Sequence, residues 1–264
     1  MSKLIKTYEY GKTPNTYDIF KAIAIVTMVI DHIGYYLFPE ILWFRVVGRI
    51  AFPIFLFLVG YSRSYQFDKW LLFGALIVLA SHALNGVHML PLNILFSILV
   101  WRIVMGRLNK TPKLLNDLVM LWVAMLVFYI PGAFLLEYSV LGMIFAVLGW
   151  HVREGRNDMA IRIAWLFTVT LWIAEQSLIM GFKLEHIALL IVEGVLLNIA
   201  MMQFSMRNYP LPPAHETPSP TFYESCVILL ARNSLLIYVV HVVAIQTYAH
   251  YLYPDRYGQM FKIF

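Results

Sequence analysis

Two apolar segments of membrane-spanning length lie close together near the start of the chain, YDIFKAIAIVTMVIDHIGYYLF at 17–38 and WFRVVGRIAFPIFLFLVGYSRS at 43–64. A helix of about 20 apolar residues crosses a bilayer core of about 30 Å. Unlike a plain membrane anchor, these segments carry Asp31, His32 and Arg49 in their interiors. Each such group costs at least ~2.5 kcal/mol to insert, so we expect these three residues to have a functional role.

Helical spacing places the polar residues of each segment on one face, because side chains three and four positions apart are neighbours. Asp18 and His32 are then separated by roughly 21 Å along the first helix. We expect Pro53 to leave the carbonyl of Arg49 without its helical hydrogen bond. The two faces are predicted to line one polar path across the membrane, with Asp18, Lys21, Ile25, Met28, His32 and Tyr35 on the first and Arg49, Phe52, Leu56 and Arg63 on the second.

The composition indicates an integral membrane protein. Hydrophobic residues make up 61% of the chain and charged residues 13%, against about 45–50% and 25% in soluble proteins. The net charge of +5 lies in basic loops of the kind that flank membrane spans, so it does not indicate nucleic-acid binding. The single cysteine, Cys226, excludes an intramolecular disulfide and a cysteine-based metal cluster. We expect no metal, and no cleaved signal peptide ahead of the first span.

Further apolar runs predict one all-α polytopic bundle of roughly nine to ten transmembrane helices, with Asn15 or Thr16 capping the first. Turns are predicted at Asn85-Gly86 and Pro131-Gly132. The expected organisation is a cytoplasmic tail at 1–16, a transmembrane domain at 17–250 with a cytoplasmic Pro-rich linker at 207–225, and a short C-terminal tail at 251–264. The runs after the first two segments are 69–85, 90–106, 115–130, 133–151, 160–179, 184–203 and 225–250.

Lys and Arg are concentrated in alternate loops, which predicts a cytoplasmic N-terminus. In this orientation Asp31, His32, Arg49, Glu137 and His241 all fall toward the outer side of the membrane. Such a group has the parts of an acyl-transfer site, in which a His takes a proton and an Arg stabilises the oxyanion. Adjacent helical residues point about 100° apart, so Asp31 is not expected to orient His32. Glu137, from another helix, is a better candidate for that role, and His241 is the alternative.

Two motifs resemble a known family. MVIDHIGYYLFPE at 28–40, followed by GRIAFPIFLFLVGYS at 48–62, is similar to the pattern of the TraX family, and LNILFSILV at 92–100 is similar to a third family segment. The best-known role of that family is N-terminal acetylation of a conjugative pilin subunit in the bacterial inner membrane. DIFKAIAIVTM at 18–28 and RNSLLIYVVH at 232–241 resemble segments of other membrane acyltransferases, including the heparan-α-glucosaminide N-acetyltransferase group.

The resemblance implies an acetyltransferase of the bacterial inner membrane that takes acetyl-CoA from the cytoplasm and acetylates an acceptor on the far side. The acceptor is either the amine of a secreted peptide or pilin, or a hydroxyl of a cell-surface glycan. Basic residues at the inner helix ends, Lys21, Arg63, Lys69 and Arg107, are candidate partners for the CoA phosphates. The residues that match the family patterns are Asp31, His32, Gly48, Arg49 and Pro53, with Asn233, Ser234, Tyr238 and His241 in the last helix.

Two other functions remain open from the sequence. A proton-coupled transporter would also bury His, Asp and Arg along a transmembrane path. A non-catalytic assembly factor would require neither acetyl-CoA nor His32. Structural roles are also open for single residues. In these alternatives, Arg49 pairs with Asp31 and holds the two helices together, and His32 bonds to water or a carbonyl at the membrane interface.

Overall fold

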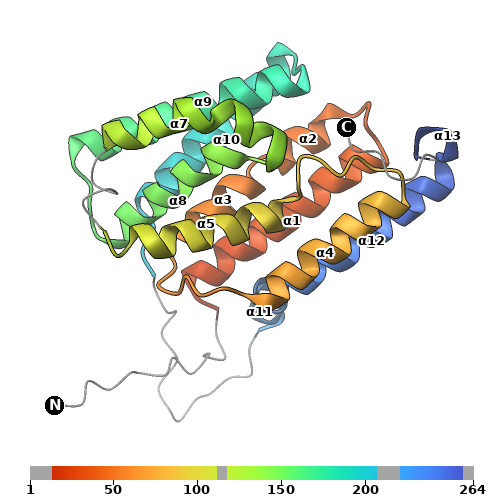
Figure 1. Ribbon diagram of the computed structural model, residues 1–264, viewed down its shortest axis with the longest axis horizontal. Helices are drawn as coiled ribbons and strands as arrows, with labels where there is room; N and C mark the ends of the chain where they lie inside the picture. Colours follow the sequence, from red (N-terminus) through yellow and green to blue (C-terminus); the bar gives the residue numbers. More distant parts are fainter. Residues whose placement is uncertain (1–13, 112–117, 207–220, 258–264) are drawn as a thin grey trace, which may run out of the picture.

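A computed structural model describes residues 14–111, 118–206 and 221–257, and this part of the chain is helical throughout, without a strand. Figure 1 shows the helices packed as one bundle. Their bounds are α1 (Thr16–Tyr36), α2 (Leu42–Gly48), α3 (Ala51–Tyr61), α4 (Lys69–Leu84), α5 (Ile94–Leu108), α7 (Leu118–Leu135), α8 (Ser139–Arg153), α9 (Met159–Met180), α10 (Leu184–Met202), α11 (Phe222–Arg232), α12 (Ser234–Leu252) and α13 (Pro254–Tyr257).

Five of the described helical segments are long and apolar enough to cross a membrane, so the chain is a membrane protein. They are α1, the combined segment Leu42–Tyr61, α9, α10 and α12. Helix α4 and the Val140–Arg153 part of α8 are apolar but shorter. Each predicted apolar run coincides with at least one helix, but the expected count of nine to ten spans is not confirmed.

Helix α1 begins where the sequence predicts. Asn15 is its N-cap, and the Asn15 side chain accepts a hydrogen bond of 2.9 Å from the backbone N–H of Asp18. In return, the Asp18 carboxylate accepts one of 3.2 Å from the backbone N–H of Asn15. This reciprocal pair satisfies two N–H groups that a helix start otherwise leaves unpaired. Asp18 is therefore a capping residue of α1.

The second apolar segment is two helices, and the prediction of one continuous polar face is wrong there. Helix α2 ends at Gly48 and α3 begins at Ala51. Pro53, the third residue of α3, has no N–H, and among the described residues no backbone N–H donates to the carbonyl of Arg49, as expected. Phe52 and Leu56 are 2% and 0% exposed and pack in the apolar core, and Arg63 is exposed beyond the end of α3.

Two other helix ends differ from the prediction. Pro131 lies inside α7, which continues to Leu135, so the turn follows at 136–138. The last apolar run is divided at Asn233 into α11 and α12, and α11 already begins at Phe222 behind the cap Thr221. The predicted Asn85-Gly86 turn is present, with Gly86 at φ +65°. Residues 1–13, 207–220 and 258–264, which hold most of the two tails and the linker, lie outside the described residues.

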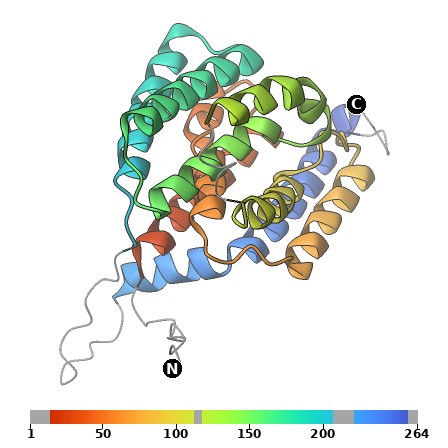
Figure 2. The same cartoon turned by 60° about the vertical axis from the view of Figure 1, so that its left-hand side comes forward.

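Helices α1 and α3 run through the interior of the bundle, as Figures 1 and 2 show. Helices α4 and α12 pack together on one side, and α8, α9 and α10 lie on the other. The longest close approach joins α3 to α8. There a Cβ on Gly60 would overlap the main chain of Ala146, and one on Gly149 would overlap the carbonyl of Phe57. Small residues at a membrane helix interface allow backbones to approach in this way.

Gly60→Ala is therefore expected to destabilise the protein by about 1–3 kcal/mol, because the added methyl meets backbone that has no freedom to move away. Gly194→Ala is the matched control in a helix. Its added methyl meets side chains only, with Cδ1 of Ile173 at 2.9 Å, Cγ1 of Val169 at 3.1 Å and the ring of Trp172 at 3.3 Å. The thermal unfolding midpoint in detergent should fall more for Gly60→Ala than for Gly194→Ala. Equal midpoints would contradict the close-packed α3–α8 interface.

Candidate functional site

A cavity of about 550 Å³ lies where several helices end or begin. Its walls come from the C-terminal part of α1, from α2, from the connection between α4 and α5, from the α7–α8 turn and from the last turns of α9. Its lining includes Asp31, His32, Arg49 and Glu137, four of the five residues that the sequence placed in one layer. The fifth, His241, contacts His32 from α12.

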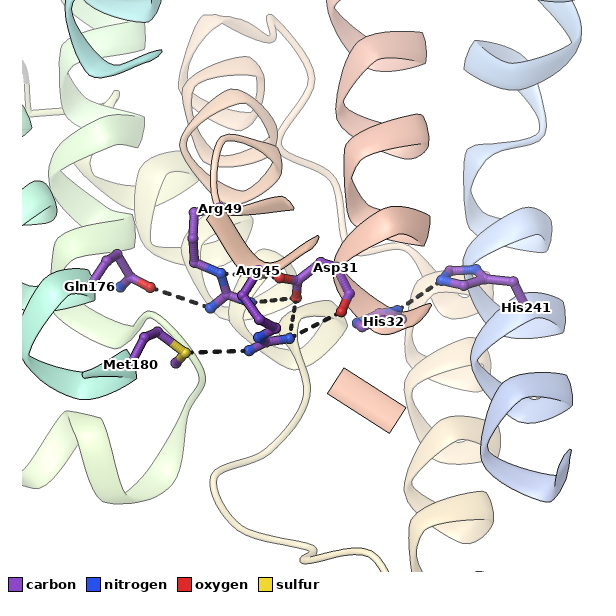
Figure 3. A network of polar contacts seen from close by, with 7 residues as sticks. All are labelled: Asp31, His32, Arg45, Arg49, Gln176, Met180 and His241. Carbon is purple, nitrogen blue, oxygen red and sulfur yellow. Dashed lines mark hydrogen bonds and ion pairs between the residues drawn. The ribbon is translucent and has the colours of Figure 1, made fainter. Parts of the chain in front are cut away.

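Asp31 is the centre of the charged part of the site (Figure 3). Its Oδ2 accepts a hydrogen bond of 2.8 Å from Nη1 of Arg45 and another from Nη2 of Arg49, while Oδ1 accepts one of 3.2 Å from Nε of Arg49. All three residues are buried, with exposures of 6%, 8% and 4% for Asp31, Arg45 and Arg49. Two guanidinium groups on one carboxylate leave a net positive charge beside the cavity.

The two arginines differ in how many of their N–H groups are occupied. Arg49 uses Nε and Nη2 on Asp31, and its Nη1 donates to Oε1 of Gln176 at 3.3 Å. Arg45 uses Nη1 on the side chain and main chain of Asp31. Its Nη2 meets only the sulfur of Met180, at 3.8 Å, which is a weak acceptor. Arg45 therefore has the donor that is available to a ligand.

Gly48 permits this arrangement. A Cβ at Gly48 would overlap Asp31, so a side chain there would push α2 away from α1. Arg45 and Arg49 are four residues apart, and the backbone N–H of Arg49 donates to the carbonyl of Arg45 at 3.1 Å. Both arginines therefore reach the same face toward α1. The match of Gly48 to the family pattern thus has a physical reason at this site.

His32 pairs with His241, and the hydrogen bonds assign the tautomer of both. Nδ1 of His241 lies 2.6 Å from the carbonyl oxygen of Ile237, which has no proton to give, so this nitrogen is the donor. Nε2 of a neutral His241 is then an acceptor, and it lies 2.8 Å from Nδ1 of His32. His32 therefore donates from Nδ1 and keeps a lone pair on Nε2. That nitrogen has the state a general base needs.

Of the two residues expected to orient His32, His241 has that position and Glu137 does not. Glu137 lies in the α7–α8 turn, and its carboxylate faces the backbone N–H of Ile94. Its backbone N–H donates to Leu92 and its carbonyl accepts from the hydroxyl of Ser97 at 2.6 Å. Among the described residues Glu137 forms no direct ion pair, although it lies within electrostatic range of Arg49 and Arg45, and its side chain lines the cavity.

A second carboxylate, which sequence reasoning missed, lines the same cavity. Glu175 on α9 accepts a hydrogen bond of 2.6 Å from the hydroxyl of Tyr129 on α7 and one of 3.3 Å from Nε2 of Gln176. Gln176 in turn accepts from Arg49. A polar chain thus runs from Tyr129 through Glu175 and Gln176 to the arginine cluster.

The basic residues proposed for CoA do not line this cavity. Arg63, Lys69 and Arg107 are exposed, and Lys69 lies over the ring of Trp70 at 5.5 Å. Lys21 is partly buried on α1, within electrostatic range of Asp18 and Arg102.

Besides His241, three residues match the family pattern in the last helix, and they lie in different surroundings. Asn233 is exposed and donates to the carbonyl of Leu229, while Ser234 is buried. Tyr238 lies beside the histidine pair, with ring centroids 5.8 Å from His32 and 5.7 Å from His241. Of these three, Tyr238 is in the site.

The end of α3 lies away from the cavity, and there Arg153 ties α8 to the connection that follows α3. Its Nη1 donates to the carbonyl of Ser62 at 2.6 Å and to the hydroxyl of Tyr65 at 2.8 Å, and its Nη2 donates to Asn109. Burial raises the pKa of the Tyr65 phenol, and the positive charge of Arg153 opposes that shift.

Within the described ranges, no three His, Cys, Asp or Glu side chains gather closely enough to hold a metal ion.

Comparison with known proteins places this chain in a family. Residues 16–218 match the family described as TraX protein. An uncharacterized protein of Rickettsia prowazekii (strain Madrid E) is 30% identical over 151 residues, which are 56% of this chain and 60% of that relative, so the match spans less than two thirds of its length. No solved structure matches. The family match covers most of the chain and includes the cavity with Asp31, His32, Arg45 and Arg49, so the chain belongs to the TraX family.

Proposed function

We propose that this protein is a membrane acetyltransferase that moves an acetyl group from acetyl-CoA to an amine. The observation that carries the proposal is the His32–His241 pair, which leaves Nε2 of a cavity-lining histidine as an acceptor. A base oriented by a second group, beside an arginine with a free donor, is the arrangement that acyl transfer requires.

The proposed reaction transfers one acetyl group and moves one proton. The neutral amine attacks the thioester carbonyl carbon, a C–N bond forms, and the carbonyl oxygen becomes an oxyanion. When the oxyanion collapses, the C–S bond breaks and CoA leaves as a thiolate. Nε2 of His32 takes the proton from the nitrogen and passes it to the thiolate, so the histidine is regenerated. His241 holds the ring of His32 in the required tautomer.

Arg45, rather than Arg49, is the residue that we assign to the oxyanion. The guanidinium of Arg49 is occupied by Asp31 and Gln176, whereas Nη2 of Arg45 has only a sulfur nearby. Asp31 and Arg49 then hold Arg45 in position. A charged donor aimed at the developing oxyanion in a buried site typically contributes about 10²–10³-fold in rate.

The cavity favours an amine over a hydroxyl as acceptor. Glu137 and Glu175 line it, and neither carboxylate has an ion-pair partner among the described residues. Two such carboxylates attract an ammonium group, which first gives one proton through a carboxylate to water, and the neutral amine then attacks as described above. A glycan hydroxyl has no charge for them to recognise. The acceptor that fits best is therefore the free N-terminus of a peptide, which includes a secreted pilin subunit.

The remaining parts of the proposal concern the membrane. We place the protein in the bacterial inner membrane with its N-terminus in the cytoplasm, because basic residues are concentrated in alternate loops. Acetyl-CoA then approaches from the cytoplasm, where Lys21, Arg63, Lys69 and Arg107 are the cations for its phosphates. Asn233 and Ser234, at the α11–α12 junction, belong to the same proposed donor side.

The test uses detergent-purified protein, radiolabelled acetyl-CoA and a short synthetic peptide with a free N-terminal alanine. We expect label on the peptide amine, and none on a peptide with a blocked N-terminus that carries serine hydroxyls. Label on the hydroxyl peptide alone would contradict the amine assignment. If neither peptide is labelled by a demonstrably folded protein, the transferase proposal is wrong, and a transporter or an assembly factor takes its place.

A further inference from the structure

The backbone of Tyr138 has a conformation that its residue type disfavours. Tyr138 lies at φ 55° and ψ 31°, in the left-handed helical region, and it is the only non-glycine with positive φ among residues 14–111, 118–206 and 221–257. For a residue with a Cβ this conformation costs roughly 1–2 kcal/mol. Glycine and asparagine are the residues that adopt it most readily.

Tyr138 is also a poor choice for the helix that follows it. It is the N-cap of α8, and its side chain makes no capping hydrogen bond. Ser, Thr, Asp and Asn are preferred at this position, and their absence costs about 1 kcal/mol. Asparagine would satisfy both the left-handed backbone and the cap. Two local preferences are therefore broken at one residue, as is expected where function selects the side chain.

The surrounding contacts hold Tyr138 rigidly. The preceding residue, Glu137, is bound through its main chain to Leu92 and Ser97. The ring of Tyr138 stacks on Phe52 with centroids 4.1 Å apart and an interplanar angle of 7°. The guanidinium of Arg49 lies over the same ring, 5.8 Å from its centroid. A phenylalanine would make the same ring contacts, so they do not explain the hydroxyl.

The hydroxyl of Tyr138 is the group that remains to be explained. Tyr138 lines the cavity together with His32 and Arg45. In the part of the chain that the structure describes, its hydroxyl forms no hydrogen bond, whereas the hydroxyls of Tyr36, Tyr65 and Tyr129 each have a partner. Tyr138 is half-buried at the cavity wall, so a ligand bound in the cavity would supply a partner for this hydroxyl.

We propose that Tyr138 is a catalytic residue whose hydroxyl donates a hydrogen bond to the carbonyl oxygen of the acetyl group. This inference rests on the proposed acetyl transfer. As the amine attacks and the oxygen gains negative charge, the hydrogen bond from Tyr138 strengthens, while the proton stays on the tyrosine. Tyr138 and Nη2 of Arg45 then form a two-donor oxyanion site, and the pinned left-handed backbone fixes the hydroxyl before the substrate arrives.

Tyr138→Phe tests the hydroxyl alone, in the peptide-labelling assay with acetyl-CoA. We expect kcat to fall about 100-fold, as for loss of one oxyanion donor. The KM for acetyl-CoA and the thermal midpoint should stay close to those of the wild type. Tyr65→Phe is the matched control, because Tyr65 lies outside the cavity and its hydroxyl is bonded to the carbonyl of Gly60 at 2.7 Å. This control should lose some stability and keep its kcat.

Tyr138→Asn separates catalysis from folding. Asparagine suits both the left-handed backbone and the cap, which offsets part of the lost ring contacts with Phe52 and Arg49, so this variant should still fold and lack the catalytic rate. The inference is overturned if Tyr138→Phe keeps the wild-type kcat, or if its rate and its thermal midpoint fall together. If the wild-type protein transfers no acetyl group, the proposed function and this inference fail together. A fully active Tyr138→Phe beside an active wild type overturns this inference alone.

Discussion

Replacing His32 with alanine is expected to lower the rate of acetyl transfer by about 10²–10⁴-fold, the usual contribution of a general base. The loss should appear in kcat, because the proton of the attacking amine then has no acceptor at the place where His32 Nε2 lies. The KM for acetyl-CoA should change little, since His32 is assigned no contact with the CoA phosphates. The measurement is steady-state labelling of the alanine peptide by purified protein.

Two variants give this result its controls. His250→Ala removes a histidine of α12 that does not line the cavity, and it should leave the rate unchanged. His241→Phe removes the acceptor for Nδ1 of His32 while keeping an aromatic ring beside it, so the rate should fall less than in His32→Ala. A normally inserted His32→Ala protein with full activity would contradict the assignment of His32 as the base.

Asp31→Asn is expected to destabilise the protein by about 3–5 kcal/mol, as does the loss of one partner from a buried ion pair. The variant would leave Arg45 and Arg49 buried without their counter-charge. At a site in the membrane such a change is enough to reduce the amount of folded protein. The measurements are the amount of protein in isolated membranes and the thermal midpoint in detergent.

Asp158→Asn is the matched control for this charge removal. Asp158 pairs with Arg156 at 2.8 Å on the surface, where solvent screens an ion pair and it contributes little to stability. Asparagine also keeps the hydrogen bond to the N–H of Ile161 that caps α9. Asp158→Asn should therefore accumulate normally. Wild-type stability in Asp31→Asn would show that the two arginines have another counter-charge, and it would contradict the site as described.

The sequence predicts the membrane class and the start of α1 well, because both depend on local properties. Apolar runs reflect the bilayer, and the Asn15–Asp18 cap is complete within four residues. The division of the second segment near Arg49 has a local signal in Pro53, which has no N–H for the carbonyl of Arg49. The contacts that the division allows have no such signal, because Arg45 and Arg49 meet Asp31 only through the packing of α2 against α1. The apolar pattern of 43–64 is the same for one helix or two.

The sequence predicts most of the residues that line the site, but only some of the contacts between them. Asp31, His32, Arg49 and Glu137 do line one cavity, but His32 pairs with His241, which is 209 residues away. The register of α1 against α12 decides that pairing, and one sequence contains no measure of it. Arg45 had a usable signal, because it lies four residues before Arg49 and so on the same helical face. Nothing in the sequence indicates the left-handed backbone of Tyr138.

The most direct test of the account is acetylation across a sealed membrane. The purified protein is reconstituted into liposomes that enclose acetyl-CoA, and the alanine peptide is added only outside. The account predicts acetylated peptide outside the liposomes with the wild-type protein, and none with His32→Ala. An absence of acetylated peptide in both samples, with acetyl-CoA still enclosed and the protein folded, would contradict the proposal that this membrane protein transfers acetyl groups.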